Sequence, residues 1–150
     1  MTMHDPGRGP LAALDPGRCK CGLVCTDRQR TCLVHALVLP PEATLARLHH
    51  WRREDRLAAV VLGNGTGSRH WRQQLEGLLP VLMVEEKSTT LEGRRRYWEL
   101  FPPRGWIRLL PMGLRQPPRD WDDVVAQLLL ERWLRRPLPR PPQPAPFTPR

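Results

Sequence analysis

The sequence predicts an α/β domain built on a mixed five-stranded sheet, three antiparallel strands then two parallel ones, flanked by helices on both faces. Three observations lead to this fold. The first 39 residues hold three short apolar runs joined by short polar turns, and short connections favour antiparallel neighbours. Two later apolar runs are unbroken, as is typical of parallel strands buried on both faces. Apolar residues at helical spacing follow each later run, which favours helices packed on the sheet.

The first half of the chain is expected to form three strands and then a helix. The strands cover 11–14, 21–25 and 31–39, and Pro40-Pro41 stops the third. A helix fits 41–53, where apolar side chains recur at helical spacing.

The second half alternates strands with helices. The expected elements are a strand over 57–62, a helix capped by Ser68, a strand over 81–84, a helix opened by Thr89 and a helix over 120–134. Both strands are predicted to be buried on both faces because their apolar runs are unbroken. Thr89 and Glu92 have the spacing of a capping box, and Asp120 is a good N-cap for the last helix.

The length of 150 residues predicts one domain. We expect residues 1–10 to form a loose leader, 11–136 the domain, and 137–150 a proline-rich disordered tail. The alternative for the tail is an extended segment that docks on a partner. No apolar run approaches the ~20 residues of a membrane span, and the N-terminus has no apolar signal region. These observations predict a cytoplasmic protein that does not enter a membrane.

The four cysteines, Cys19, Cys21, Cys25 and Cys32, do not have the spacing of a zinc site. Zinc sites usually offer two close Cys pairs, or a Cys pair followed by a His pair, and these intervals match neither. Since no export signal is visible, disulfides are not expected. We therefore interpret the cysteines as small, half-buried strand residues.

The chain is strongly basic, with 24 Lys and Arg against 15 Asp and Glu and a net charge of +9. Nearly all of this charge is arginine, which binds phosphate in a two-point geometry and stacks on bases. The composition therefore favours a nucleic-acid partner, although an arginine-rich composition also reflects base bias in a genome. The candidate nucleic-acid-binding residues are Arg69, Arg72, Lys87, Arg94, Arg95, Arg96 and Arg104. The alternative is that these side chains form a solvated helix face. Trp98 and Trp106 are predicted mainly as core residues, with base stacking as their alternative role.

Carboxylates stand at three places that can converge. Asp15 ends the first strand, Glu85 and Glu86 end the last, and Asp122 and Asp123 open the last helix. Sheets of this type form their sites at strand ends, and clustered carboxylates repel one another unless a cation neutralises them. Oxygen ligands suit Mg²⁺ or Mn²⁺, which can activate water for phosphodiester cleavage.

Each of these acids has an alternative role. Asp15 before Pro-Gly is also a common turn residue. Strand alternation does not choose between Glu85 and Glu86. Asp122 lies on the helix face that points toward packed structure, so we favour it over Asp123, whose position is explained by helix capping.

At these residues the chain resembles the YqgF/RuvX family, in its cyanobacterial resolvase-like branch. The motifs are Leu14-Asp15-Pro16-Gly17, the stretch from Val84 to Glu92, and Asp122-Asp123-Val124-Val125-Ala126. The loop from Gly63 to Ser68, the stretch Arg95-Arg96-Tyr97-Trp98 and the loop Pro102-Pro103-Arg104-Gly105 also have counterparts in that branch. The sequence departs from the family pattern at Glu85, Lys87, Gly93 and Val125.

The resemblance implies a ribonuclease H-like, Holliday-junction-resolvase-like nuclease of the kind implicated in pre-16S rRNA processing. It also implies that Asp15, Glu86 and Asp122 are the catalytic, metal-binding acids. Glu85 and Asp123 stay as possible additional acids. The expected function is a metal-dependent phosphodiesterase acting on an rRNA precursor or on branched DNA. Cutting both strands of a junction would require a homodimer, whereas trimming one strand would not. The alternative is a noncatalytic module that binds nucleic acid or the ribosome.

Overall fold

The computed structural model describes residues 5–141. The five strands are β1 (Leu11–Asp15), β2 (Cys21–Thr26), β3 (Leu33–Leu39), β4 (Ala59–Gly63) and β5 (Val81–Val84). They form one sheet in the order β3-β2-β1-β4-β5, in which β1, β2 and β3 are antiparallel and β1, β4 and β5 are parallel. The predicted mixed five-stranded sheet, with three antiparallel strands followed by two parallel ones, is confirmed.

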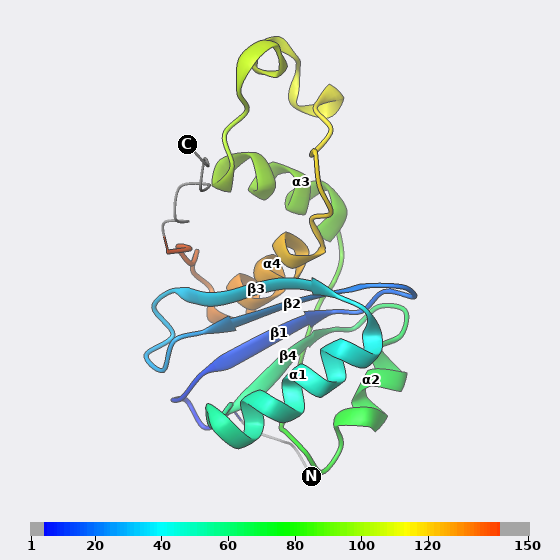
Figure 1. Ribbon diagram of the computed structural model, residues 1–150, viewed down its shortest axis with the longest axis vertical. Helices are drawn as coiled ribbons and strands as arrows, with labels where there is room; N and C mark the ends of the chain where they lie inside the picture. Colours follow the sequence, from blue (N-terminus) through cyan, green and yellow to red (C-terminus); the bar gives the residue numbers. More distant parts are fainter. Residues whose placement is uncertain (1–4, 142–150) are drawn as a thin grey trace, which may run out of the picture.

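Helices cover both faces of this sheet, as Figure 1 shows. They are α1 (Pro41–Glu54), α2 (Ser68–Leu75), α3 (Thr89–Leu100) and α4 (Asp122–Leu134). Along β1, alternate side chains enter two separate cores: Ala12 and Leu14 pack on the side of α1 and α2, and Leu11 and Ala13 on the side of α4. None of the helices in residues 5–141 is long and apolar enough to cross a membrane.

The inner strand β4 is fully buried, but the prediction that β5 is buried on both faces is wrong. Three of its four residues are only half-buried. The reason is its place at the edge of the sheet, next to β4 alone. An unbroken apolar run does not distinguish an inner strand from an edge strand.

The predicted helix caps also differ from the structure. The N-cap of α3 is Ser88, in a left-handed conformation, so Thr89 is already helical and forms no capping box with Glu92. The N-cap of α4 is Trp121, because Asp120 lies outside the helix and pairs with Lys20 instead. The N-cap of α2 is Gly67 rather than Ser68. In each case the first residue of the helix is decided either by a contact outside the helix or by the conformation of the preceding loop.

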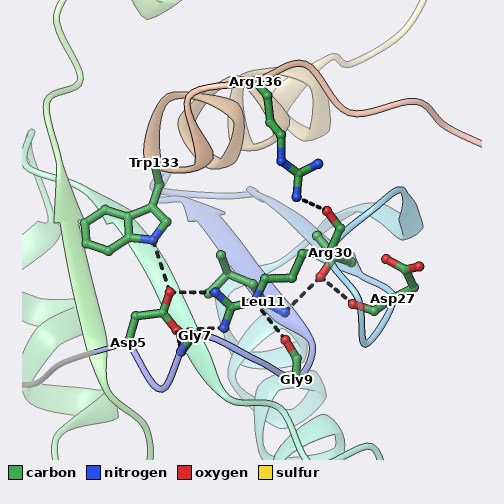
Figure 2. A network of polar contacts seen from close by, with 9 residues as sticks. Asp5, Gly7, Gly9, Leu11, Asp27, Arg30, Trp133 and Arg136 are labelled. Carbon is green, nitrogen blue, oxygen red and sulfur yellow. Dashed lines mark hydrogen bonds and ion pairs between the residues drawn. The ribbon is translucent and has the colours of Figure 1, made fainter.

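The described parts of both expected tails pack on the domain. The Asp5 carboxylate pairs with the buried guanidinium of Arg30 at 2.6 Å and accepts a hydrogen bond from the Trp133 indole at 3.5 Å (Figure 2). Leu138 is completely buried against α4, where Gln127 donates to its carbonyl at 3.0 Å. The packed unit therefore extends from residue 5 to residue 140, beyond the expected bounds of 11 and 136. Residues 142–150 of the expected tail lie outside the described residues.

The cysteines lie where small apolar side chains fit. Cys21 and Cys25 are buried in β2, Cys32 is half-buried and Cys19 is exposed. Cys21 and Cys25 are therefore strand residues as predicted, but they are buried rather than half-buried. All four thiols are free.

Candidate active site

Asp15, Glu86 and Asp122 line one pocket of about 320 Å³. They come from the end of β1, the loop after β5 and the first turn of α4. The other residues that line the pocket are Lys20, Thr89, Thr90, Asp120, Trp121 and Val125. Three stretches that are distant in the sequence thus bring carboxylates to one concave surface.

A glycine in β2 allows two of these acids to approach each other. Gly22 pairs with Asp15 across the β1–β2 ladder. A Cβ atom on Gly22 would lie 1.9 Å from the Asp122 carbonyl oxygen and 2.9 Å from the Asp123 backbone nitrogen. Only a residue without a side chain lets the backbone of α4 come this close to the strand. Gly22 therefore places the first turn of α4 directly beside the end of β1.

The loop after β4 holds the third acid. The Asn64 side-chain oxygen accepts a hydrogen bond from the Glu86 backbone N–H at 3.1 Å, and the Asn64 N–H donates to the Val84 carbonyl at 3.0 Å. The Glu86 side chain lies over the glycines of this loop: a Cβ on Gly65 would meet its Oε2 at 1.5 Å. The loop that follows β4 thus fixes the backbone of Glu86, and the Glu86 side chain lies against it.

The concentration of negative charge changes the protonation of the pocket. Burial, together with the charges of Glu86 and Asp122, raises the pKa of Asp15 to about 7. Burial also raises the pKa of Asp122, although the Lys20 ammonium opposes that shift. At neutral pH the pocket therefore holds carboxylates that a positive charge would stabilise.

The donor set is suited in kind to a hard divalent cation, because it consists of carboxylate oxygens. As the side chains lie, no three His, Cys, Asp or Glu residues between 5 and 141 form a ready metal-binding group. A cation shared by all three acids would therefore require their side chains to turn toward it. The rigid part of the site is the backbone, which Gly22 and Asn64 hold in place.

The two additional candidate acids lie elsewhere. Glu85 lines a different pocket, together with Lys87 and Arg132. Asp123 is buried and pairs with Arg119 and Arg140, each at 2.9 Å. Burial acts to raise the pKa of Asp123, but the hydrogen bonds and charges of the two guanidinium groups outweigh it and lower that pKa. Asp123 thus anchors the start of α4, and the carboxylate of Asp122 is the one that lines the acidic pocket.

The candidate nucleic-acid-binding residues differ in their exposure and in their contacts. The exposed ones are Arg69, Arg72, Lys87, Arg95 and Arg104. Arg94 is half-buried. Arg96 has a structural role, since its guanidinium donates to both carboxylate oxygens of the buried Glu131, at 3.1 and 2.8 Å. The interpretation of 94–96 as one phosphate-binding run is therefore not supported at Arg96.

Sequence reasoning missed Lys20, whose ammonium lines the acidic pocket. Its Nζ pairs with Asp120 at 2.5 Å, which joins the β1–β2 turn to the segment before α4. Its position in the sequence could have indicated this role, because Lys20 is one of two lysines in the chain and lies in the turn that follows Asp15. Thr89 and Thr90, at the start of α3, also line the pocket.

Two glycine substitutions compare the stability cost of a methyl group that meets backbone with that of one that meets a movable side chain. Gly22→Ala is expected to cost about 1–3 kcal/mol in the free energy of unfolding, because the added methyl group meets the backbone of α4. Gly65→Ala is expected to stay within about 1 kcal/mol of wild type, since it meets only the movable end of Glu86. Urea denaturation of both variants measures the difference. Equal stabilities would contradict the close approach at Gly22.

Comparison with known proteins gives a partial sequence match. No family model matches the chain. Over 56 residues it is 38% identical to the "Putative pre-16S rRNA nuclease" of Coxiella burnetii strain Dugway 5J108-111, and equally to that of strain RSA 331 / Henzerling II. The match covers 37% of this chain and spans 31% of the length of these curated relatives. It confirms the resemblance to the YqgF/RuvX nucleases.

Among solved structures, the chain is similar to one titled "T. thermophilus RuvC in complex with Holliday junction substrate". The sequence identity is 16% and the TM-score is 0.45. The alignment covers 85% of this chain and 95% of that chain.

Proposed function

We propose that this protein is a divalent-metal-dependent nuclease that cleaves phosphodiester bonds in structured nucleic acid. One observation carries the proposal: acids from three separate elements, Asp15, Glu86 and Asp122, line a single pocket. Such a cluster raises the free energy of the metal-free protein, so a ligand that neutralises it is the natural reason for its presence. The match to relatives named as nucleases supports phosphodiester chemistry.

The three carboxylates would hold Mg²⁺ or Mn²⁺. A divalent ion bound by carboxylates activates water and stabilises the leaving oxygen of a phosphodiester. The remaining roles belong to the chain itself. Lys20, at the pocket, is placed to donate to a phosphate oxygen, and Trp121 and Val125 supply apolar parts of the pocket lining.

The exposed basic residues would contact the phosphate backbone, and we assign this role to Arg69, Arg72, Lys87, Arg95 and Arg104. The net charge of +9 favours a polyanionic substrate. The name of the curated relatives favours an rRNA precursor, in which case the reaction belongs to ribosome biogenesis. Branched DNA is the second substrate to test, and cutting both strands of a junction would require a homodimer.

A noncatalytic module that binds nucleic acid or the ribosome is the second candidate. The observation that favours it is the arrangement of the acids, which do not form a ready three-ligand group in residues 5–141. This candidate predicts salt-sensitive binding without turnover.

A substrate panel distinguishes the two candidates. End-labelled precursor-type RNA and a four-way DNA junction are incubated with the protein in Mg²⁺, in Mn²⁺ and in EDTA, and the molar mass is measured in parallel. A nuclease gives products with a divalent ion and none in EDTA. Tight binding to both substrates with no product under any metal condition would reject the nuclease and support the binding module.

A further inference from the structure

Residues 101–119 form a long excursion between α3 and α4, which we call the arm. It contains two short 3-10 helices, Gly105–Leu109 and Met112–Leu114. Figure 1 shows the arm projecting beyond α3, with its returning segment running into α4. Because α4 begins at Asp122, the end of the arm leads directly to the acidic pocket.

The arm exposes large apolar side chains. Trp106 is 71% exposed, Leu109 86% and Leu114 65%. The prediction of Trp106 as a core residue is therefore wrong, whereas Trp98 is buried as predicted. Trp98 packs against α4 and Tyr97, but no residue between 5 and 141 folds over the arm at Trp106. Concentrated apolar exposure of this kind marks an interaction surface.

The charge of the arm is of one sign. It contains Arg104, Arg108, Arg115 and Arg119, and no Asp or Glu. Arg115 holds the arm in shape, since it donates to the Leu110 carbonyl at 2.9 Å and to the Arg108 carbonyl at 3.3 Å. Within residues 5–141, the guanidinium groups of Arg104 and Arg108 make no hydrogen bond or ion pair, and both residues are exposed. Two free guanidinium groups therefore flank the exposed indole, each two residues away.

We propose that the arm binds a single-stranded segment of nucleic acid, in which the Trp106 indole stacks on an unpaired base and Arg104 and Arg108 contact the phosphates on either side. Unpaired bases stack on aromatic side chains, and basic side chains beside such a platform contact the phosphates. This inference rests on the proposed function and deepens it, because it adds an unpaired region to the nucleic acid that the site would cleave.

A second copy of the chain is a poorer occupant for the arm. A twofold contact between two arms would bring the arginines of one arm against those of the other, with no carboxylate in either arm to pair them. A nucleic acid supplies the missing negative charge. Self-association through the arm is kept as an outcome of the test.

Binding without cleavage tests the arm. In EDTA, fluorescein-labelled single-stranded RNA of about 12 nucleotides is titrated with wild type, Trp106→Ala and Trp106→Phe, followed by anisotropy. Loss of one base stack is expected to weaken binding about 5- to 150-fold in Trp106→Ala, and Phe is expected to restore most of the affinity. A fully abasic oligonucleotide of the same length, which carries the phosphates but no bases, should bind wild type and Trp106→Ala alike.

Matched controls lie outside the arm. Val34→Ala removes an apolar side chain that is 45% exposed on β3, and Arg53→Gln removes an exposed charge on α1. Both should bind like wild type. Arg108→Gln should reduce the slope of log affinity against log salt by about 0.7, the value for one phosphate contact on a single strand.

The outcomes separate the arm from the nuclease. Equal affinity of wild type and Trp106→Ala for the RNA would overturn the arm proposal, even if the substrate panel gave products. A change in molar mass in Trp106→Ala with unchanged RNA affinity would identify the arm as a contact between copies instead. Weakened binding in Trp106→Ala together with no product in any metal would leave the arm supported and the nuclease rejected.

Discussion

Asp15→Asn is expected to abolish metal-dependent cleavage and, at the same time, to stabilise the metal-free protein at neutral pH. The loss of cleavage should be at least about 10²-fold, because even groups that only orient metal ligands contribute 10–100-fold. The gain in stability has a separate cause. The pKa of Asp15 lies near 7 in the folded protein and near 3.8 in an exposed chain, so ionisation disfavours the fold.

The sign of this effect fixes its pH window. Between about pH 4 and pH 7 the folded protein binds a proton at Asp15 that the unfolded chain has released, so stability falls as pH rises. Above pH 7 the penalty is complete, and about three pKa units set an upper limit of about 4 kcal/mol. The Asp15→Asn substitution removes this penalty because the amide carries no charge. The variant should therefore be more stable than wild type at pH 8, and nearly equal to it at pH 4.

Thermal unfolding at the two pH values, with and without magnesium, measures both parts. Magnesium should raise the stability of wild type at pH 8, by about 2.7 kcal/mol at 100 times its dissociation constant. It should have a much smaller effect on Asp15→Asn. A variant less stable than wild type at pH 8 would show that charge repulsion does not govern this pocket.

The neighbouring acids of α4 should respond in opposite ways. Asp123→Asn is expected to cost about 3–5 kcal/mol in the free energy of unfolding, because it leaves Arg119 and Arg140 without their buried partner. Since the pKa of Asp123 is lowered, its contribution is present at neutral pH and is lost as the pH falls below about 4. Asp122→Asn should leave stability close to wild type and remove cleavage instead.

Urea denaturation and the cleavage assay, applied to this pair, form a matched test. The two positions share a helix turn, a charge and a substitution, so only the surroundings of the side chain differ. If Asp122→Asn kept full activity and Asp123→Asn lost activity without losing stability, the two acids would have to exchange roles in the proposed site.

Much of the site could be predicted from the sequence because its acids follow strand ends or open a helix. The direction and order of the strands bring the end of β1 and the loop after β5 to the same edge of the sheet. Apolar periodicity and short turns in the sequence indicate this arrangement. The preference for Asp122 over Asp123 came from helix geometry alone. Strand alternation does not decide between Glu85 and Glu86, since successive residues at a strand end point to opposite faces of the sheet.

Other features depend on contacts between distant residues. Arg96 was expected on a phosphate-binding face, but the buried carboxylate of Glu131, 35 residues later, holds it. Lys20 reaches the pocket because it pairs with Asp120, 100 residues away. The need for a glycine at position 22 is visible only in the structure, because the backbone of α4 lies directly on β2 there.

The sequence by itself determined the class of sheet, the order of its elements and the three stretches that supply the acids, because apolar periodicity and turn chemistry are local properties of the chain. Only the tertiary structure decided which charges are free and which are paired, where helices begin, and that Trp106 faces solvent. Those outcomes depend on what other segments lie against a side chain, and burial and electrostatic pairing are set by that contact rather than by neighbours in sequence.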